Sequence, residues 1–213
     1  MPKFDHHLHT SRYSPDSAID PDELLQCARA AGLDGVVITD HDFQWPDDEL
    51  ADLAARANGL RVFSGAEISA REGHFLVYGL PDLDEAPPGI SLRELLEVVE
   101  GHGAAIVAAH PFRWDQPFES YIHAHGPVFD ALELVSNNVT PETRGKTAAI
   151  LERYPNMAAT GSSDGHDTDV IGCYFSALGG QIETLADFVA ALKRGDVRPG
   201  HRPGARQASG PIG

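Results

Sequence analysis

The sequence has few cysteines and no long apolar run, and each shortage excludes a class of protein. Its 213 residues include two cysteines, Cys27 and Cys173. They are far apart and form no CxxC motif, so we expect neither a disulfide framework nor a cysteine-based zinc site. No window approaches the roughly 20 apolar residues of a membrane-spanning helix, and residues 1–10 lack the regions of a signal peptide. These absences predict a cytoplasmic protein that has no membrane partner.

Basic residues are also scarce, because 16 lysines and arginines stand against 32 acidic residues and give a formal charge of -16. Such a chain repels a phosphate backbone, so we expect no long nucleic acid as a partner. A phosphorylated substrate would need a local positive centre. Divalent cations could supply one, because a cluster of histidines and carboxylates becomes electropositive once metal is bound. The sequence contains no Gly-x-Ser-x-Gly elbow and no Walker-type loop, so no protein nucleophile is indicated.

Short apolar runs alternate with longer amphipathic stretches, a pattern typical of an α/β protein with a largely parallel sheet. The chain length suits a single domain, which we place at residues 1–197. Residues 198–213 are rich in Gly, Pro and Arg and predict a flexible C-terminal tail. The predicted strands are 3–9, 34–39, 61–66, 75–79, 104–109, 131–135, 157–160 and 173–178, and the predicted helices are 20–32, 46–58, 91–103, 141–153 and 184–194.

Histidines and carboxylates cluster at or just after the predicted strands. The clusters are Asp5-His6-His7-Leu8-His9, Asp40-His41-Asp42, Glu67, His110 and Asp164-Gly165-His166. Side chains two apart on a strand share a face, so His7 and His9 can bind one ion together. Taken singly, each cluster has an ordinary explanation, such as a solvated strand end or a turn. Together, mixed imidazole and carboxylate donors from several strand ends predict a site for divalent metal ions.

These segments resemble the motifs of the PHP family, named after polymerase and histidinol phosphatase. The resemblance runs from Phe4 to about Cys173, and its order and spacing are specific. It implies a distorted (β/α)7 TIM-like barrel and the activity of a metal-dependent phosphoesterase. The matching segments are Asp5-His6-His7-Leu8-His9-Thr10, Tyr13-Ser14-Pro15-Asp16-Ser17, Ile38-Thr39-Asp40-His41-Asp42, Gly65-Ala66-Glu67-Ile68, Gly73-His74, Ala109-His110-Pro111 and Ser163-Asp164-Gly165-His166.

The resemblance also implies a set of metal ligands. Two or three divalent ions of manganese, iron or zinc would be held in three groups: His7, His9 and Asp164; then His74 and His110, bridged to the first group by Glu67; then Asp16, His41 and His166. Some relatives carry histidine in the region of Asp16, and a carboxylate there shifts the preference from zinc toward manganese or iron. Gly73-His74 also fits an ordinary turn before a strand.

By the same resemblance, a metal-activated water would hydrolyse a small phosphoester: a nucleotide, a nucleoside bisphosphate, or a sugar or histidinol phosphate. Arg113, three residues after His110, is expected to bind the substrate phosphate, although it could instead stack on Trp114 or Phe112 at the surface. Asp40 is expected to orient His41 or a nearby ligand. His166 is a second candidate catalytic residue, which would protonate the leaving oxygen.

Two other functions remain open on the sequence alone. The same ions could hydrolyse an amide, as in an amidohydrolase, or could simply stabilise a non-catalytic interaction module. Arg113 favours phosphate, and the presence of a ligand at every expected position argues against a degenerate site. The segment 118–126 is either a lid or a packed helix. The sequence leaves the oligomeric state undetermined.

Overall fold

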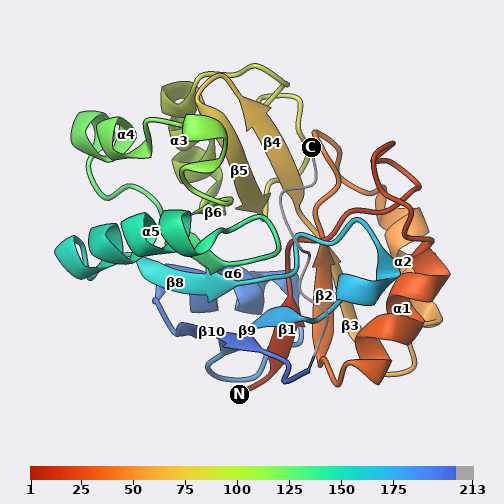
Figure 1. The fold of residues 1–213 in the computed structure, drawn as a ribbon. Coiled ribbons are helices and arrows are strands. Elements are labelled where there is room, and N and C mark those ends of the chain that lie inside the picture. Colours follow the sequence, from red (N-terminus) through yellow and green to blue (C-terminus); the bar gives the residue numbers. More distant parts are fainter. Residues whose placement is uncertain (205–213) are drawn as a thin grey trace.

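The computed structural model describes residues 1–204 and contains two five-stranded sheets with helices on their outer sides (Figure 1). The first sheet has the order β10-β9-β1-β2-β3, and the second has the order β4-β5-β6-β7-β8. The strands are β1 (Lys3–Asp5), β2 (Gly35–Ile38), β3 (Arg61–Ser64), β4 (Ala66–Ala70), β5 (Gly73–Tyr78), β6 (Ala105–Ala108), β7 (Ala131–Val135), β8 (Ala158–Gly161), β9 (Tyr174–Leu178) and β10 (Val197–His201).

Both sheets mix parallel and antiparallel pairs, whereas the sequence predicts a largely parallel sheet. In the first sheet β1, β2 and β3 are parallel, but β9 runs antiparallel to both β1 and β10. In the second sheet β6, β7 and β8 are parallel, while β5 is antiparallel to β4 and β6. Only two residues, Arg71 and Glu72, join β4 to β5, and a link this short can connect only antiparallel neighbours.

The predicted strand at 61–66 is split in two by Gly65. A Cβ atom at this position would lie 2.6 Å from the Val77 carbonyl oxygen and 2.7 Å from Tyr78 Cδ1, so the close approach requires glycine. The chain therefore leaves the first sheet after β3 and enters the second as β4. As a result Glu67 lies inside a strand of the second sheet, where the sequence predicts it just beyond a strand end.

The closed seven-unit barrel implied by the resemblance is not found in residues 1–204. The two sheets meet where β8 lies beside β10 and β9, and β8 forms no ladder with either strand. Between β8 and β9 the contact is made by a side chain. The Ser176 hydroxyl accepts a hydrogen bond from the Gly161 amide and donates one to the Gly161 carbonyl, both at 3.0 Å. The fold is therefore a single α/β domain with two sheets.

Within residues 1–204, six α-helices cover the outer sides of the sheets. The first begins after Asp20, whose carboxylate accepts hydrogen bonds from the first turn, and the third begins with a capping box at Ser91 and ends at Gly103. The longest has 13 residues, and no helix within residues 1–204 has the length and apolarity needed to cross a membrane. The helices are α1 (Pro21–Ala30), α2 (Asp47–Ala55), α3 (Leu92–His102), α4 (Phe118–His125), α5 (Pro141–Arg153) and α6 (Leu185–Lys193).

The apolar core joins the two sheets into one domain. Phe4 and Leu178 from the first sheet pack in one buried cluster with Leu76 and Val107 from the second, and Phe188 of α6 covers that cluster. A second cluster packs α1 and α2 against the first sheet, and a third packs α3, α4 and α5 against the second. The shared core holds the strand ends of both sheets in a fixed relation, which positions the site described below.

Two further segments of the sequence analysis form secondary structure: the start of the predicted C-terminal tail and the segment 118–126. The start of the predicted tail belongs to β10, because residues 197–201 pair antiparallel with β9. The rest of that tail, residues 205–213, lies outside the described residues. The segment 118–126 contains helix α4, and this helix packs into the core through buried Phe118 and Ile122.

Candidate metal centre

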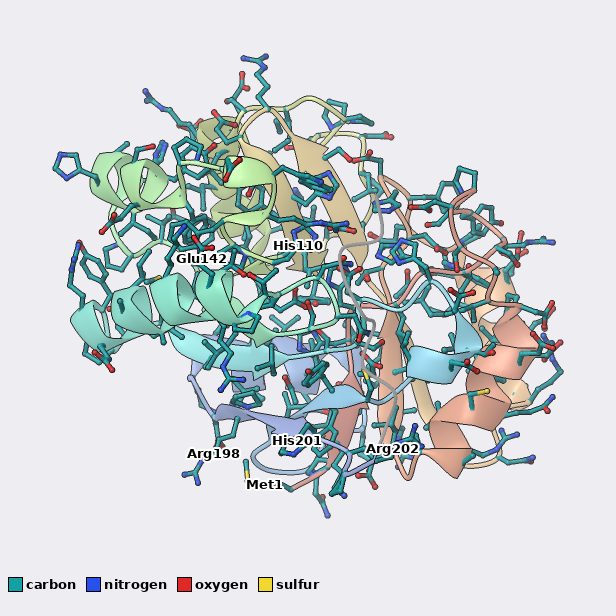
Figure 2. The ribbon with its side chains drawn as sticks, viewed as in Figure 1. Met1, His110, Glu142, Arg198, His201 and Arg202 are labelled. Carbon is teal, nitrogen blue, oxygen red and sulfur yellow. The ribbon has the colours of Figure 1, made fainter. Side chains whose placement is uncertain are left out.

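The predicted ligands meet where strands of the two sheets come together. His7 and His9 follow β1, and the backbone between them forms a parallel bridge, Leu8 with Gly165, to the segment after β8. A second bridge joins His41, after β2, to Glu67 in β4. Figure 2 shows His110 in the interior of the molecule, well away from the end where Met1 lies. Residues separated by more than 150 positions thus face one another.

Five of these residues form a buried floor, each at most 2% exposed: His7, His9, Glu67, His110 and Asp164. Oε2 of Glu67 lies 3.2 Å from Nε2 of both His7 and His9, and its Oε1 lies 3.1 Å from His110 Nε2. Oδ1 of Asp164 lies 3.3 Å from His7 Nε2 and 3.5 Å from His9 Nε2. Glu67 is therefore the central residue of the floor.

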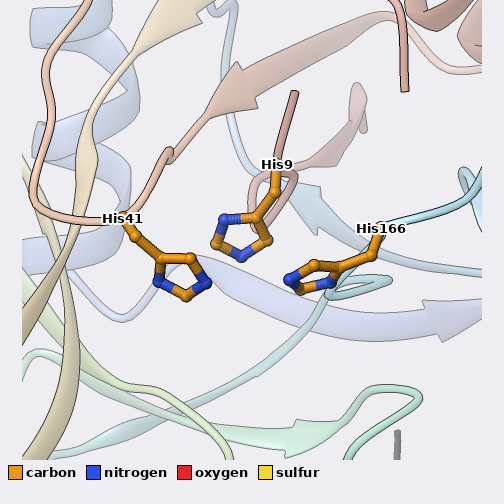
Figure 3. A group of neighbouring side chains, drawn as sticks. All are labelled: His9, His41 and His166. Atoms are coloured by element: carbon orange, nitrogen blue, oxygen red, sulfur yellow. The ribbon is translucent and has the colours of Figure 1, made fainter. Parts of the chain in front are cut away.

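The other four ligands form a more exposed rim: Asp16, His41, His74 and His166. Oδ2 of Asp16 lies 3.2 Å from His41 Nε2 and 3.1 Å from His166 Nε2. The rings of His41 and His166 each stack 4.3 Å from the ring of His9, and Figure 3 shows the three rings converging. Nδ1 of His74 lies 2.9 Å from Glu67 Oε1. His74 is thus directed toward the floor by its position in β5, as expected of a ligand.

Three polar atoms at the centre are buried without a hydrogen-bond partner among the described residues: His7 Nε2, His9 Nε2 and Glu67 Oε2. Leaving such atoms unsatisfied costs roughly 1–3 kcal/mol each. Nε2 of each histidine lies 3.2 Å from Glu67 Oε2, and imidazole and carboxylate donors are those that zinc, manganese and iron accept. The residues present therefore fit divalent metal ions.

The donor atoms form four overlapping groups, each with its atoms within 4.8 Å of one another. All nine predicted ligands are brought together within the described residues, but the groups differ in two respects from those expected. His74 groups with His41 and Glu67, while His110 groups with His7 and Glu67. His9 joins His41 and His166, and Asp16 contacts the same two rings from the solvent side. Which residues share an ion, and how many ions bind, stay predictions. The four groups are His9, His41 and His166; His7, Glu67 and His110; His7, His9 and Asp164; and His41, Glu67 and His74.

Opposite charges balance one another on the floor. Burial alone would lower the pKa of His9, but the adjoining carboxylates outweigh it and raise this pKa to about 9. The pKa of His7 lies well above its usual value for the same reasons. Burial would raise the pKa of Glu67, yet the surrounding histidines hold it well below its usual range. The metal-free centre therefore keeps protons on His7 and His9, and a divalent cation would replace them.

His166 differs from the floor histidines. Its burial, together with the nearby His9, lowers the pKa of His166. A lowered pKa favours the uncharged ring, a state that suits a metal ligand. The role of His166 as the acid stays a prediction.

Asp40, which we expected to orient His41 or a nearby ligand, is fully buried. Its carboxylate accepts four hydrogen bonds, two from Thr10 at 2.6 and 2.8 Å, one from Ser14 Oγ at 2.8 Å and one from Trp45 Nε1 at 2.7 Å. The Ser14 hydroxyl in turn accepts a hydrogen bond from the backbone amide of His41 at 3.0 Å. Asp40 therefore positions the loop around His41 through Ser14, and a catalytic role for its carboxylate stays a prediction.

Two residues that our sequence reasoning missed support the floor. Glu133, in β7, is fully buried and lies 3.1 Å from His7 Nδ1, and it accepts hydrogen bonds from the His110 amide at 2.8 Å and from Ser162 Oγ at 2.5 Å. Asn138 donates to Asp164 Oδ2 at 2.5 Å. A carboxylate at Nδ1 fixes a histidine so that Nε2 faces the metal. The only sequence signal for Glu133 is a lone acid within the apolar strand Ala131–Val135.

Arg113 lies at the edge of the centre. Its Nη1 is 3.8 Å from Asp164 Oδ2, and its guanidinium carbon is 4.0 Å from the centre of the Trp114 ring. The stack on Trp114 that we considered as an alternative is therefore present, and it holds the guanidinium beside the floor. Binding of phosphate by Arg113 stays a prediction.

The histidines outside the motif do not belong to the centre. The ring of His6 is buried and lies 2.7 Å from the Tyr78 hydroxyl and 3.0 Å from Ser176 Oγ, and burial lowers its pKa to about 4. His6 is thus a structural residue that holds β1 against both sheets. The others are at least partly exposed: His102, His123, His125 and His201. Both cysteines are free thiols.

Three solved structures share this fold. PsfC from Pseudomonas syringae superposes with a TM-score of 0.72 at 20% identity, over 96% of this chain and 93% of its own. A candidate metal-dependent phosphoesterase from Bifidobacterium adolescentis gives 0.63 at 20% identity, over 89% and 96%. An amidohydrolase from Chromobacterium violaceum gives 0.62 at 19% identity, over 77% and 87%.

Comparison by sequence is more specific. An uncharacterised protein of Methanocaldococcus jannaschii is 32% identical over 120 residues, which cover 52% of this chain and 68% of the relative. The family model of the PHP domain matches residues 5–191, a range that contains all nine residues of the floor and rim. The chain belongs to the PHP domain family.

Proposed function

We propose that this protein is a metal-dependent phosphoesterase that hydrolyses a small phosphoester. The observation that carries the proposal is the meeting of three unsatisfied buried donor atoms, on His7, His9 and Glu67, with an arginine at the edge of the same centre. Family membership supports a hydrolase that uses metal ions. Bound divalent ions would neutralise phosphate oxygens and lower the pKa of a water molecule.

The residues of the chain itself have distinct roles in this proposal. The floor and rim would hold two or three ions, and Glu133 and Asn138 would keep His7 and Asp164 in position. Arg113 would bind the transferred phosphate, because its planar donors match two phosphate oxygens and its charge lies beside the centre. No protein side chain needs to act as a nucleophile.

An amidohydrolase would use the same ions, and one structural neighbour is an amidohydrolase. Arg113 favours the phosphoesterase, since an amide carbonyl carries no full charge for a guanidinium to neutralise. Arg113 also argues against a non-catalytic interaction module in which the metal ions only stabilise the fold. Such ions need no positively charged side chain beside them.

The test is hydrolysis of p-nitrophenyl phosphate by purified protein, together with elemental analysis of bound metal. We expect two or three ions per chain and metal-dependent release of phosphate, both reduced in His9→Ala. His123→Ala, at an exposed histidine of α4 outside the centre, serves as the matched control and should retain both. Full metal occupancy without phosphatase activity would contradict the proposal, and hydrolysis of an amide panel by the same sample would then favour the amidohydrolase.

A further inference from the structure

Trp114 is an exposed aromatic residue at the edge of the metal centre. The residue is 58% exposed, and the other exposed large apolar residues within residues 1–204 are Met1 at 61% and Val128 at 37%. Single exposed apolar residues are common, so exposure alone implies nothing. The position of Trp114 is more informative: its ring lies 5.4 Å from the ring of His74 and 5.7 Å from that of His110.

The backbone that carries Trp114 is unusual. Four residues in the segment 110–115 have positive φ: His110 (+28°), Phe112 (+67°), Trp114 (+53°) and Asp115 (+56°). This region is unfavourable for bulky side chains, and such conformations persist at functional sites where surrounding contacts enforce them. Here the conformation turns an indole toward the metal centre instead of into the core.

The indole is also held in place. The Arg113 guanidinium stacks 4.0 Å from its ring centre, and the rings of His74 and His110 stand at 70° and 76° to it. These contacts fix a planar aromatic surface beside the position expected for a bound phosphate, while more than half of the side chain stays open to solvent. A flat, immobilised and accessible ring at this place is suited to stacking.

We propose that Trp114 determines specificity by stacking on a planar ring in the leaving group of the substrate. The inference rests on the proposed phosphoesterase function and narrows its substrate class. Among the small phosphoesters considered, it favours those whose leaving group carries a planar ring, namely nucleotides, nucleoside bisphosphates and histidinol phosphate, over sugar phosphates, which carry none. A nucleotide whose phosphate lies at Arg113 would place its base one pentose away, in the region of the indole.

Adenosine 5′-monophosphate and ribose 5-phosphate form the matched substrate pair, since both are esters at the same ribose carbon and only one has a base. We expect wild type to prefer the nucleotide in kcat/KM and Trp114→Ala to lower that preference roughly tenfold, mainly through KM. Trp114→Phe should retain most of it, because an aromatic ring remains. Val128→Ala, at another exposed apolar residue in the loop before β7, should leave both substrates unchanged.

A merely structural role for Trp114, as a support for Arg113, would lower hydrolysis of both substrates equally, and that result would overturn the inference. The same holds if Trp114→Ala changes neither.

A second measurement does not depend on turnover. The only other tryptophan, Trp45, is 5% exposed, so quenching of fluorescence by added nucleotide should report on Trp114. We expect adenosine 5′-monophosphate to quench wild type but not Trp114→Phe, and ribose 5-phosphate to quench neither. If wild type hydrolyses neither ester but still shows selective quenching, the proposed function fails and the stacking site stands. If adenosine 5′-monophosphate does not quench the fluorescence of wild type, the stacking proposal is wrong, whether or not the protein hydrolyses either ester.

Discussion

The floor and the rim of the metal centre contain the same kinds of residue but differ in burial. The five floor side chains are at most 2% exposed, whereas in the rim Asp16 is 53%, His41 25%, His74 24% and His166 14% exposed. A buried charged cluster is held firmly because its alternatives are costly, while an exposed one exchanges readily with water. An ion on the floor should therefore bind more tightly than an ion on the rim.

The two regions also differ in what supports them. Floor residues are fixed from behind by partners that are themselves buried, Glu133 at His7 and Asn138 at Asp164. His41 and His166 of the rim are joined mainly through the half-exposed carboxylate of Asp16. Supporting contacts of this kind tune metal affinity as strongly as burial does. We therefore expect substitutions in the floor to weaken metal binding and activity more than substitutions in the rim.

The largest effect should follow from Glu67→Gln, which removes the central charge of the floor and keeps the size of the side chain. Loss of metal binding would remove several kcal/mol of transition-state stabilisation, so we expect kcat/KM for p-nitrophenyl phosphate to fall by ~10³-fold. Metal analysis should show fewer ions per chain. Glu97→Gln, at an exposed residue of α3, is the matched control. Near-normal activity in Glu67→Gln would show that the floor is not the catalytic centre.

The second prediction concerns the change with pH in the folding stability of the metal-free protein. In the metal-free protein the pKa of His9 is about 9, above its unfolded value of 6.5, so its stabilisation is complete below pH 6.5 and is lost as the pH rises through 9. His7 shifts in the same direction. Raising the pH from 6.5 to 9 should therefore reduce the stability of chelator-treated protein by ~3 kcal/mol, seen as a lower Tm.

Metal-loaded protein should lose much less stability over the same range, because the cation takes the place of the protons. His9→Gln should flatten the pH dependence of the metal-free protein, and His102→Ala, at an exposed histidine, should not. Identical slopes with and without metal would mean that ions do not bind where the histidine protons lie.

Glu133→Gln should have the next largest effect. In wild type Oε1 of Glu133 faces His7 Nδ1 and accepts from Ser162, and Oε2 accepts from the His110 amide. The amide keeps the shape but replaces one of these oxygens by an NH₂ group and removes the negative charge, so His7 is no longer fixed with Nε2 toward the floor. We expect metal affinity to fall about 10–100-fold, with activity recovered at saturating metal. Glu142→Gln, an exposed pair with Lys146 on α5, is the control. Activity that stays low at saturating metal would give Glu133 a direct part in the reaction instead.

The sequence was sufficient to predict that the ligands converge, because histidines and acids followed several apolar runs. Burial of those runs in one core brings their ends together, as His7, His9 and His41 illustrate. The connection of the sheets could not be predicted, since it depends on the close contact of Gly65 with Val77 and Tyr78 far along the chain. The apolar pattern of 61–66 contains no sign of that contact.

The roles of single residues were harder to predict than the position of the site. Asp40 lies next to a ligand in sequence, but its four hydrogen-bond donors come from Thr10, Ser14 and Trp45. Glu133 lies within an apolar strand, and only the packing of β7 beside β6 shows that it faces the centre. The sequence indicates which side chains are chemically able to bind metal. Contacts between distant segments decide which of these side chains are instead hydrogen-bonded to other residues, as Asp40 is.

The smallest effect should come from Asp16, the most exposed residue of the rim. Asp16→Asn removes the charge between His41 and His166 and should weaken only the rim ion, lowering activity about tenfold at limiting metal. Added manganese should restore it, since the floor stays intact. Asp16→His replaces the carboxylate beside His41 and His166 by an imidazole. This variant should keep the rim ion but shift the metal preference of the site toward zinc. If Asp16→Asn instead matched the loss in Glu67→Gln, floor and rim would act as one cooperative unit, and burial would not rank their ions.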